Sequence, residues 1–151
     1  MNNLLPDVTI ELLTKFSSKD AKNIKRLATR LGSNYQPLTD KDLKDIISSP
    51  TTYLFIARES QKKELIGMAT LAIYRIPYVK KANFDDLIVD DKYRGNGIGQ
   101  QLVEKILLTA NELGATYIDF TSNPKRIKAN KLYEKLGFKK RDTNVYRLTY
   151  D

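Results

Sequence analysis

The 151-residue sequence contains no cysteine, no histidine and no tryptophan. Without cysteine there can be no disulfide, no thiolate nucleophile and no thiolate metal ligand. Without histidine the chain lacks the commonest general base near neutral pH and the commonest metal ligand. We therefore predict no metal site, and any acid–base chemistry must rest on other groups.

Long apolar runs are also missing. No run approaches the roughly 20 residues that a helix needs to cross a bilayer. The segment that begins at Met1 has no basic stretch followed by an apolar core, so we expect no signal peptide. At this length the simplest organisation is one domain over residues 1–151, and we expect a cytoplasmic protein with no membrane partner.

The formal net charge is +8, which suits an anionic partner. Nucleic acid and a cofactor with several phosphate groups are the two candidates. The basic residues are dispersed, apart from one denser cluster made of Lys125, Arg126, Lys128 and Lys131. No DNA- or RNA-binding motif accompanies the charge. We therefore expect no nucleic-acid partner, and binding to mixed-sequence DNA at physiological salt would reverse that expectation.

Glycine is scarce, with seven in the chain, yet Gly95, Gly97 and Gly99 fall within five residues. The apolar run 87–89 precedes them and an amphipathic stretch follows, which predicts a strand, a tight loop and a helix start. Glycines there allow close backbone approach to a ligand and leave N–H groups free at the positive end of a helix. This arrangement predicts a phosphate or pyrophosphate site.

The loop fits neither common phosphate-binding pattern. Its spacing is G-x-G-x-G, which is not the dinucleotide fingerprint, and no Gly-Lys-Ser/Thr of a P-loop follows. What remains is Arg94-x-x-Gly97-x-Gly99. This pattern resembles the acetyl-CoA loop of the GNAT family of N-acetyltransferases, Gln/Arg-x-x-Gly-x-Gly/Ala. The alternative is an ordinary strand-to-helix turn.

A second segment strengthens the resemblance. Residues 126–138 are similar to the family's segment Asn/Arg-x-x-Ala-x-x-Leu/Phe-Tyr-Glu-x-x-Gly-Phe, with Tyr133 at the tyrosine position and Gly137-Phe138 at its end. The family's frequent Asn is replaced by Arg126, which makes the contact of that side chain less certain. Both segments occur in the family's order and spacing.

The hydrophobic periodicity predicts the order β-α-α-β-β-β-α-β-α-β. Capping residues Ser17 and Thr39 begin the first two helices, Gly32 ends the first, and Asn123 with Pro124 begins the last helix, which Gly137 closes. The predicted strands are 8–13, 53–57, 65–76, 83–89, 117–121 and 145–150. The order matches the GNAT fold, which implies an α/β (α+β) protein with a mixed, mostly antiparallel sheet of about six to seven strands and helices on both faces.

The resemblance also implies a set of acetyl-CoA contacts. The backbone groups of the fourth strand would pair with the pantetheine arm where that strand splays from the next, and the loop amides would hold the pyrophosphate. The residues implied are Leu87, Ile88, Val89, Arg94, Gly95, Asn96, Gly97, Ile98, Gly99, Arg126 and Tyr133.

Two catalytic groups follow from the chemistry of acetyl transfer. Tyr133 can protonate or hydrogen-bond the leaving thiolate, as a tyrosine at this place does in similar enzymes; its alternative role is packing. Asp85 and Asp86 are the candidate general bases, directly or through a water, with Asp85 favoured; the alternative is that both only form hydrogen bonds or lie at a solvated strand end. Strand alternation directs the two side chains to opposite faces. Asp90 and Asp91 are interpreted as surface charges of the loop.

The function implied is acetyl transfer from acetyl-CoA to a primary amine by direct attack. A CoA-binding regulatory module without catalysis is the alternative. The amine acceptor is open among small amines, amino acids, aminosugars, peptides and proteins, and a homodimer is possible.

Overall fold

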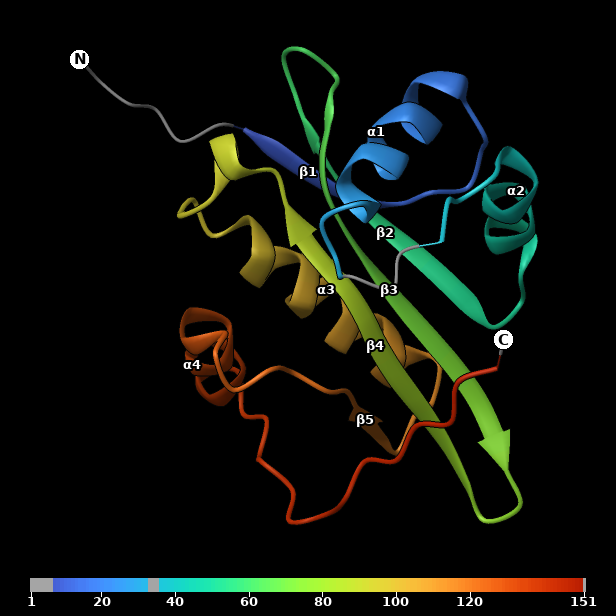
Figure 1. The fold of residues 1–151 in the computed structure, drawn as a ribbon, viewed down its shortest axis with the longest axis vertical. Coiled ribbons are helices and arrows are strands. Elements are labelled where there is room, and N and C mark those ends of the chain that lie inside the picture. Colours follow the sequence, from blue (N-terminus) through green and yellow to red (C-terminus); the bar gives the residue numbers. More distant parts are fainter. Residues whose placement is uncertain (1–6, 33–35, 151) are drawn as a thin grey trace. The chain divides into compact units, whose positions relative to one another are not determined.

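The computed structural model describes residues 7–32 and 36–150 (Figure 1). The chain divides into two compact units, residues 1–120 and 121–151, which are described separately below. The organisation as a single domain stays a prediction.

The first unit is built on a five-stranded sheet in the order β1-β2-β3-β4-β5. Strands β1 to β4 pair antiparallel, and β5 runs parallel to β4. The strands are β1 Val8–Leu12, β2 Thr52–Glu59, β3 Leu65–Ile76, β4 Val79–Val89 and β5 Tyr117–Asp119. The predicted mixed, mostly antiparallel sheet is therefore confirmed, but the described residues contain five strands rather than six or seven.

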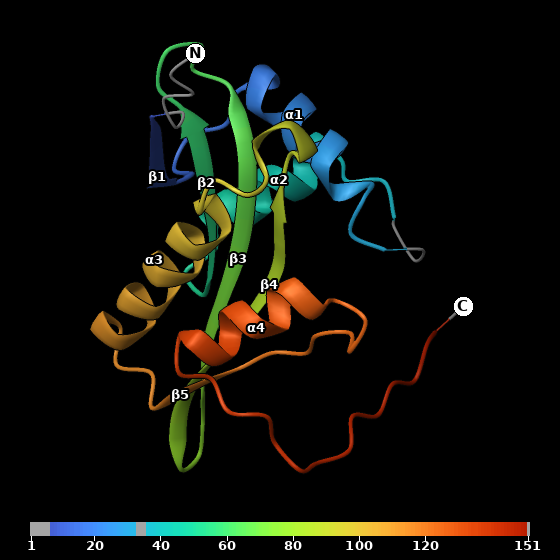
Figure 2. The same ribbon diagram turned by 90° about the vertical axis from the view of Figure 1, so that its left-hand side faces the viewer.

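Helices cover both faces of this sheet, as Figure 2 shows. α1 (Ser18–Ala28) and α2 (Asp40–Ser48) pack on one face, where Leu27 and Leu43 join Met68 and Ile88 in a buried core. α3 (Ile98–Glu112) packs on the other face and buries Leu102, Val103 and Ile106. At Gly67 of β3 a Cβ would lie 3.1 Å from the Ile88 carbonyl oxygen of the neighbouring strand, so glycine avoids crowding against the β4 backbone.

The helix ends in this unit follow the capping signals. Ser17 accepts a hydrogen bond from the Asp20 N–H, and Thr39 forms a reciprocal capping box with Asp42. α1 ends at Ala28, before the predicted Gly32. Gly114, with φ of 79°, closes α3 through the N–H bonds of a Schellman motif.

The second unit departs from prediction at both ends. Asn123 does not cap a helix: its side-chain oxygen accepts from the Lys125 N–H at 2.9 Å in a turn. α4 begins later and spans Ile127–Lys135. The predicted strand 145–150 is wrong, because these residues are unpaired and exposed, and the described part of this unit holds no other strand to pair with them.

Candidate active site

The glycine loop joins β4 to α3 through a short 3-10 turn, η1 (Asp91–Tyr93). Gly95 and Gly97 have φ of 80° and 75°, the left-handed region that favours glycine. A Cβ built on either residue would meet no described atom within 4 Å. Glycine is therefore required by the backbone conformation and not by crowding from the protein.

This conformation leaves donors available at the start of α3. Gly97 occupies the N-cap position, and its carbonyl accepts the Gln101 N–H at 3.1 Å. The N–H groups of Gly97, Ile98 and Gly99 have no hydrogen-bond partner among the described residues. Three free donors at the positive end of a fifteen-residue helix form a site suited to an anion.

Side chains of the loop form hydrogen bonds and an ion pair within the loop and with the residues just before it. Arg94 Nε donates to the Val89 carbonyl at 3.2 Å, and the Arg94 guanidinium lies 2.8 Å from the Asp91 carboxylate. The Asn96 side-chain amide donates to the Tyr93 carbonyl at 3.0 Å. Arg94 is nevertheless 59% exposed, so part of its guanidinium stays open to a ligand.

The two aspartates before the loop differ from each other. Asp91 is exposed, as predicted, but Asp90 is buried, so its interpretation as a surface charge is wrong. Arg26 of α1 donates to Asp90 at 2.5 Å, and the Lys92 N–H donates at 3.1 Å. Burial by itself raises the pKa of Asp90, but these hydrogen bonds outweigh burial and hold the pKa below its usual value.

β4 also offers backbone groups at an open edge. Its pairing with β5 covers only Lys81–Asn83, opposite 117–119. The rings of Phe84 and Phe120 lie 4.7 Å apart just beyond the last pair. Past that point no described strand pairs with the edge of β4 that faces away from β3, and this edge contains the predicted pantetheine-binding residues 87–89 (Figure 1).

A β-bulge in β4 lies next to the two candidate bases. The register passes from Thr70↔Asp85 to Met68↔Ile88, so Asp86 and Leu87 share one position opposite Ala69. Asp86 has a φ of 59°, which is rare outside glycine. The simple alternation assumed for this strand is therefore broken at the bulge, which sequence periodicity does not reveal.

Both aspartates at the bulge are exposed, and their side-chain carboxylates have no ion pair or hydrogen bond among the described residues. Desolvation by neighbouring protein atoms raises the pKa of Asp85, and the negative charge of Asp86 raises it further. Desolvation also raises the pKa of Asp86. A carboxylate with a raised pKa is a stronger base near neutral pH.

Tyr133 belongs to the second unit, on α4. Its side chain is buried, and burial raises its pKa while Arg126 opposes the rise. Gly137, with φ of 91°, closes the helix, and the Phe138 N–H donates to the Tyr133 carbonyl at 3.0 Å. The Phe138 ring meets the Tyr133 ring edge-on, with the ring centroids 6.1 Å apart.

The predicted site residues thus divide between the units. The loop, the edge of β4 and Asp85 belong to the first, and Arg126 and Tyr133 to the second. Arg126, at the N-cap position of α4, is exposed. That both sets form one site stays a prediction.

Sequence reasoning missed Arg26 of α1 and Arg30 of the turn that follows α1, which reach the turn before the loop. Arg26 binds Asp90, and Arg30 forms an ion pair with Asp91. Their partners lie more than 60 residues away, and no sequence pattern identifies them.

Two features are absent from the described residues. None of their helices is long and apolar enough to span a bilayer. They also contain no cluster of three or more acidic side chains that could hold a metal ion.

Comparison with known proteins identifies the family. The family described as "Acetyltransferase (GNAT) domain" matches residues 50–140, more than half of the chain. The chain belongs to the GNAT family. This membership supports an acetyltransferase enzyme, and GNAT acetyltransferases use acetyl-CoA.

The similarity to an individual curated relative is lower and covers only part of each protein. The chain is 31% identical over 90 residues to a "Probable glucosamine 6-phosphate N-acetyltransferase" of Drosophila melanogaster; the match covers 57% of this chain and 39% of that protein. The chain thus spans about two-fifths of the length of this curated relative.

Solved structures show the same GNAT fold. A transcriptional regulator from Bacillus halodurans C-125 has a TM-score of 0.77 at 23% identity, covering 95% of this chain and 100% of that chain. Glucosamine-6-phosphate N-acetyltransferase from Arabidopsis thaliana has a TM-score of 0.76 at 17% identity, covering 93% and 98%.

Proposed function

We propose that this protein transfers the acetyl group of acetyl-CoA to a primary amine by direct attack within a ternary complex. The observation that carries the proposal is the set of free N–H groups at the start of α3, in a chain that belongs to an acetyltransferase family. These amides hold the pyrophosphate, with Arg94 beside them, and the open edge of β4 pairs with the pantetheine arm.

The chemistry needs one base and one acid. Asp85 takes a proton from the acceptor ammonium, whose nitrogen then attacks the acetyl carbonyl carbon. The C–S bond breaks as the C–N bond forms, the thiolate leaves, and the nitrogen loses its second proton to solvent to give the neutral amide. Tyr133, whose raised pKa keeps its phenol protonated at neutral pH, hydrogen-bonds the sulfur or gives it a proton. No acyl-enzyme on cysteine is possible, since the chain has none.

The acceptor is an amine of undetermined class. The name of the Drosophila relative makes glucosamine 6-phosphate the first acceptor to test. Small amines, amino acids and peptides complete the panel.

The test is amine-dependent release of free thiol from acetyl-CoA, followed with a thiol reagent. The absence of cysteine from the chain removes the protein's own background. We expect thiol release with at least one amine and little without amine. Tight binding of acetyl-CoA with no release for any amine would instead support the non-catalytic regulatory module.

A further inference from the structure

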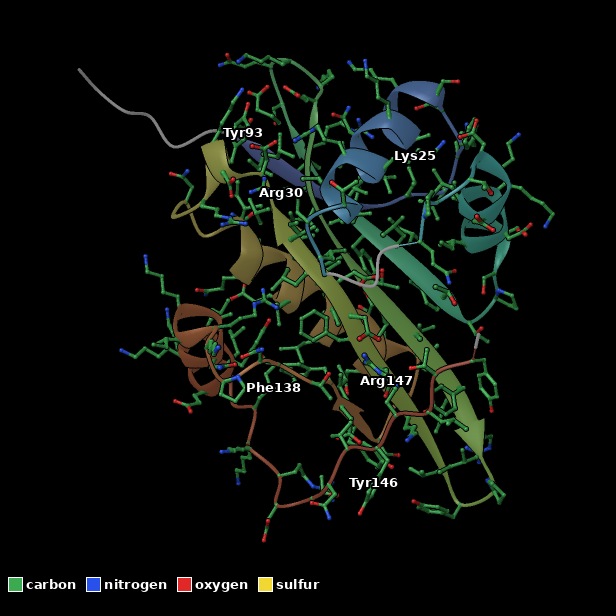
Figure 3. The ribbon with its side chains drawn as sticks, in the orientation of Figure 1. Lys25, Arg30, Tyr93, Phe138, Tyr146 and Arg147 are labelled. Carbon is green, nitrogen blue, oxygen red and sulfur yellow. The ribbon has the colours of Figure 1, made fainter. Side chains whose placement is uncertain are left out.

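The turn before the glycine loop is held from outside the loop. Asp90 and Asp91, at the start of η1, place two negative charges in the segment that leads to the glycine loop and the free amides of α3. Arg26 of α1 binds Asp90, and Arg30, two residues past the end of α1, binds Asp91. Figure 3 shows Arg30 near the turn that ends at Tyr93.

Asp91 connects the turn after α1 to the first residue of the loop. One carboxylate oxygen pairs with Arg30, and the other lies 2.8 Å from the guanidinium of Arg94. Arg94 also donates through Nε to the Val89 carbonyl. Arg30, Asp91 and Arg94 therefore form a continuous row of charges from this turn to the loop.

The charges matter because the loop suits an anion. An unneutralised Asp91 would repel phosphate groups at the adjacent amides and would compete with them for Arg94. With Arg30 in place, the Asp91 charge is balanced and Arg94 keeps a net positive charge for the ligand. We propose that Arg30 is a positioning residue for acetyl-CoA, acting through Asp91 to keep Arg94 and the loop amides available to the phosphates.

The proposal rests on the proposed function, since it takes the loop as the acetyl-CoA site. It goes beyond that function by assigning a role in acetyl-CoA binding to a residue outside the loop, in the turn that follows α1. Because the Arg30–Asp91 pair is exposed, we expect it to add little to the stability of the fold. A loss of ligand affinity can therefore be separated from unfolding.

The end of α1 provides a closely matched control. Lys25 of α1 pairs with Asp40 of α2, and the side chains are 36% and 55% exposed, against 36% and 52% for Arg30 and Asp91. The two ion pairs differ in position, because the Lys25–Asp40 pair does not contact the turn before the loop. Lys25→Gln thus removes an ion pair of similar exposure that has no contact with the loop.

The test measures acetyl-CoA affinity by calorimetry at low ionic strength, where exposed charges are least screened. We expect Arg30→Gln to raise Kd about three- to tenfold, consistent with one uncompensated exposed charge near the phosphates. Arg30→Lys should recover most of the affinity. Lys25→Gln should leave Kd within about twofold of wild type, a difference below 0.5 kcal/mol.

The decisive variant is the double change Arg30→Gln with Asp91→Asn. Removing the Asp91 charge should restore the acetyl-CoA affinity lost in Arg30→Gln. If the Arg30–Asp91 pair only held the turn in place, the double variant would bind acetyl-CoA as weakly as Arg30→Gln. The amine-dependent rate at saturating acetyl-CoA should change little in either variant, so that KM rises while kcat holds.

Each outcome separates this proposal from the proposed function. If wild type does not bind acetyl-CoA, the proposed function is wrong. If wild type binds but Arg30→Gln matches Lys25→Gln in Kd, or the double variant fails to restore binding, the role of Arg30 is overturned and the proposed function stands.

Discussion

A methyl group at Gly97 separates the ligand-binding role of the loop from its structural role. Gly97 has a φ of 75°, and a Cβ there meets no described atom within 4 Å. The cost of Gly97→Ala to the fold is therefore the backbone penalty alone, about 1–2 kcal/mol, since the side chain creates no clash. In a chain of this length that corresponds to a fall in Tm of about 2–8 °C.

Gly114 is the control for this experiment. It lies at the other end of α3, has a φ of 79° and likewise has no described atom within 4 Å of a built Cβ. Gly114→Ala should therefore lower Tm by a similar amount. It lies far from the loop amides along the helix, so acetyl-CoA affinity should stay unchanged.

Gly97→Ala and Gly114→Ala should differ in their affinity for acetyl-CoA. In Gly97→Ala, either the methyl group stands beside the free amides or the backbone relaxes to negative φ and turns them. Both results weaken anion binding, and we expect Kd for acetyl-CoA to rise at least about tenfold, or 1.4 kcal/mol. Thermal melts and calorimetry on the two purified variants provide the comparison. An equal Kd for Gly97→Ala, Gly114→Ala and wild type would refute the loop as the phosphate site.

Three other predictions concern ligand choice and electrostatics. Acetyl-CoA at a hundred times Kd should stabilise the fold by about 2.7 kcal/mol in thermal melts, with NAD and ATP doing much less; an equal shift with NAD would argue against a CoA site. Asp85→Asn should raise Tm at pH 7–8, because the pKa of Asp85 is raised in the native state and the native state loses stability as the pH rises through that pKa. The difference in Tm between Asp85→Asn and wild type should vanish near pH 3, below the unfolded pKa of about 3.9, and a Tm gain at pH 3 would contradict this. Asp20→Ala should lower the free energy of unfolding in urea by about 3 kcal/mol, because both terminal nitrogens of the Arg58 guanidinium donate to Asp20 at 3.0 Å in a largely buried pair. A loss under 1 kcal/mol would show the pair to be unimportant for stability.

Local signals in the sequence predicted local structure well. The caps at Ser17 and Thr39 lie where the sequence places them, because each cap bonds within three residues of itself. The loop at Gly95 and Gly97 was also predictable, since positive φ is available mainly to glycine. At Asn123 the same kind of signal failed, because a turn competed successfully for its side chain.

Features that depend on distant partners were not predictable. Asp90 is buried because Arg26 reaches it from a helix 64 residues earlier. The bulge at Asp86 appears only when β4 is aligned with β3. The apolar pattern of 145–150 suggested a strand, but a strand forms only where a neighbouring edge pairs with it, and the sequence does not name that edge.

The central claim is that this chain acetylates an amine with Tyr133 acting on the leaving sulfur. It is tested most directly by steady-state thiol release from wild type and Tyr133→Phe at saturating acetyl-CoA and amine, beside a calorimetric titration of each with CoA. The account predicts turnover by wild type. For Tyr133→Phe it predicts a kcat lower by about a hundredfold, the low end for general acid catalysis because a thiolate leaves readily, with CoA affinity within a few-fold. Wild-type protein that binds acetyl-CoA yet releases no thiol with any amine, or an unchanged kcat in Tyr133→Phe when chemistry limits the rate, would contradict it.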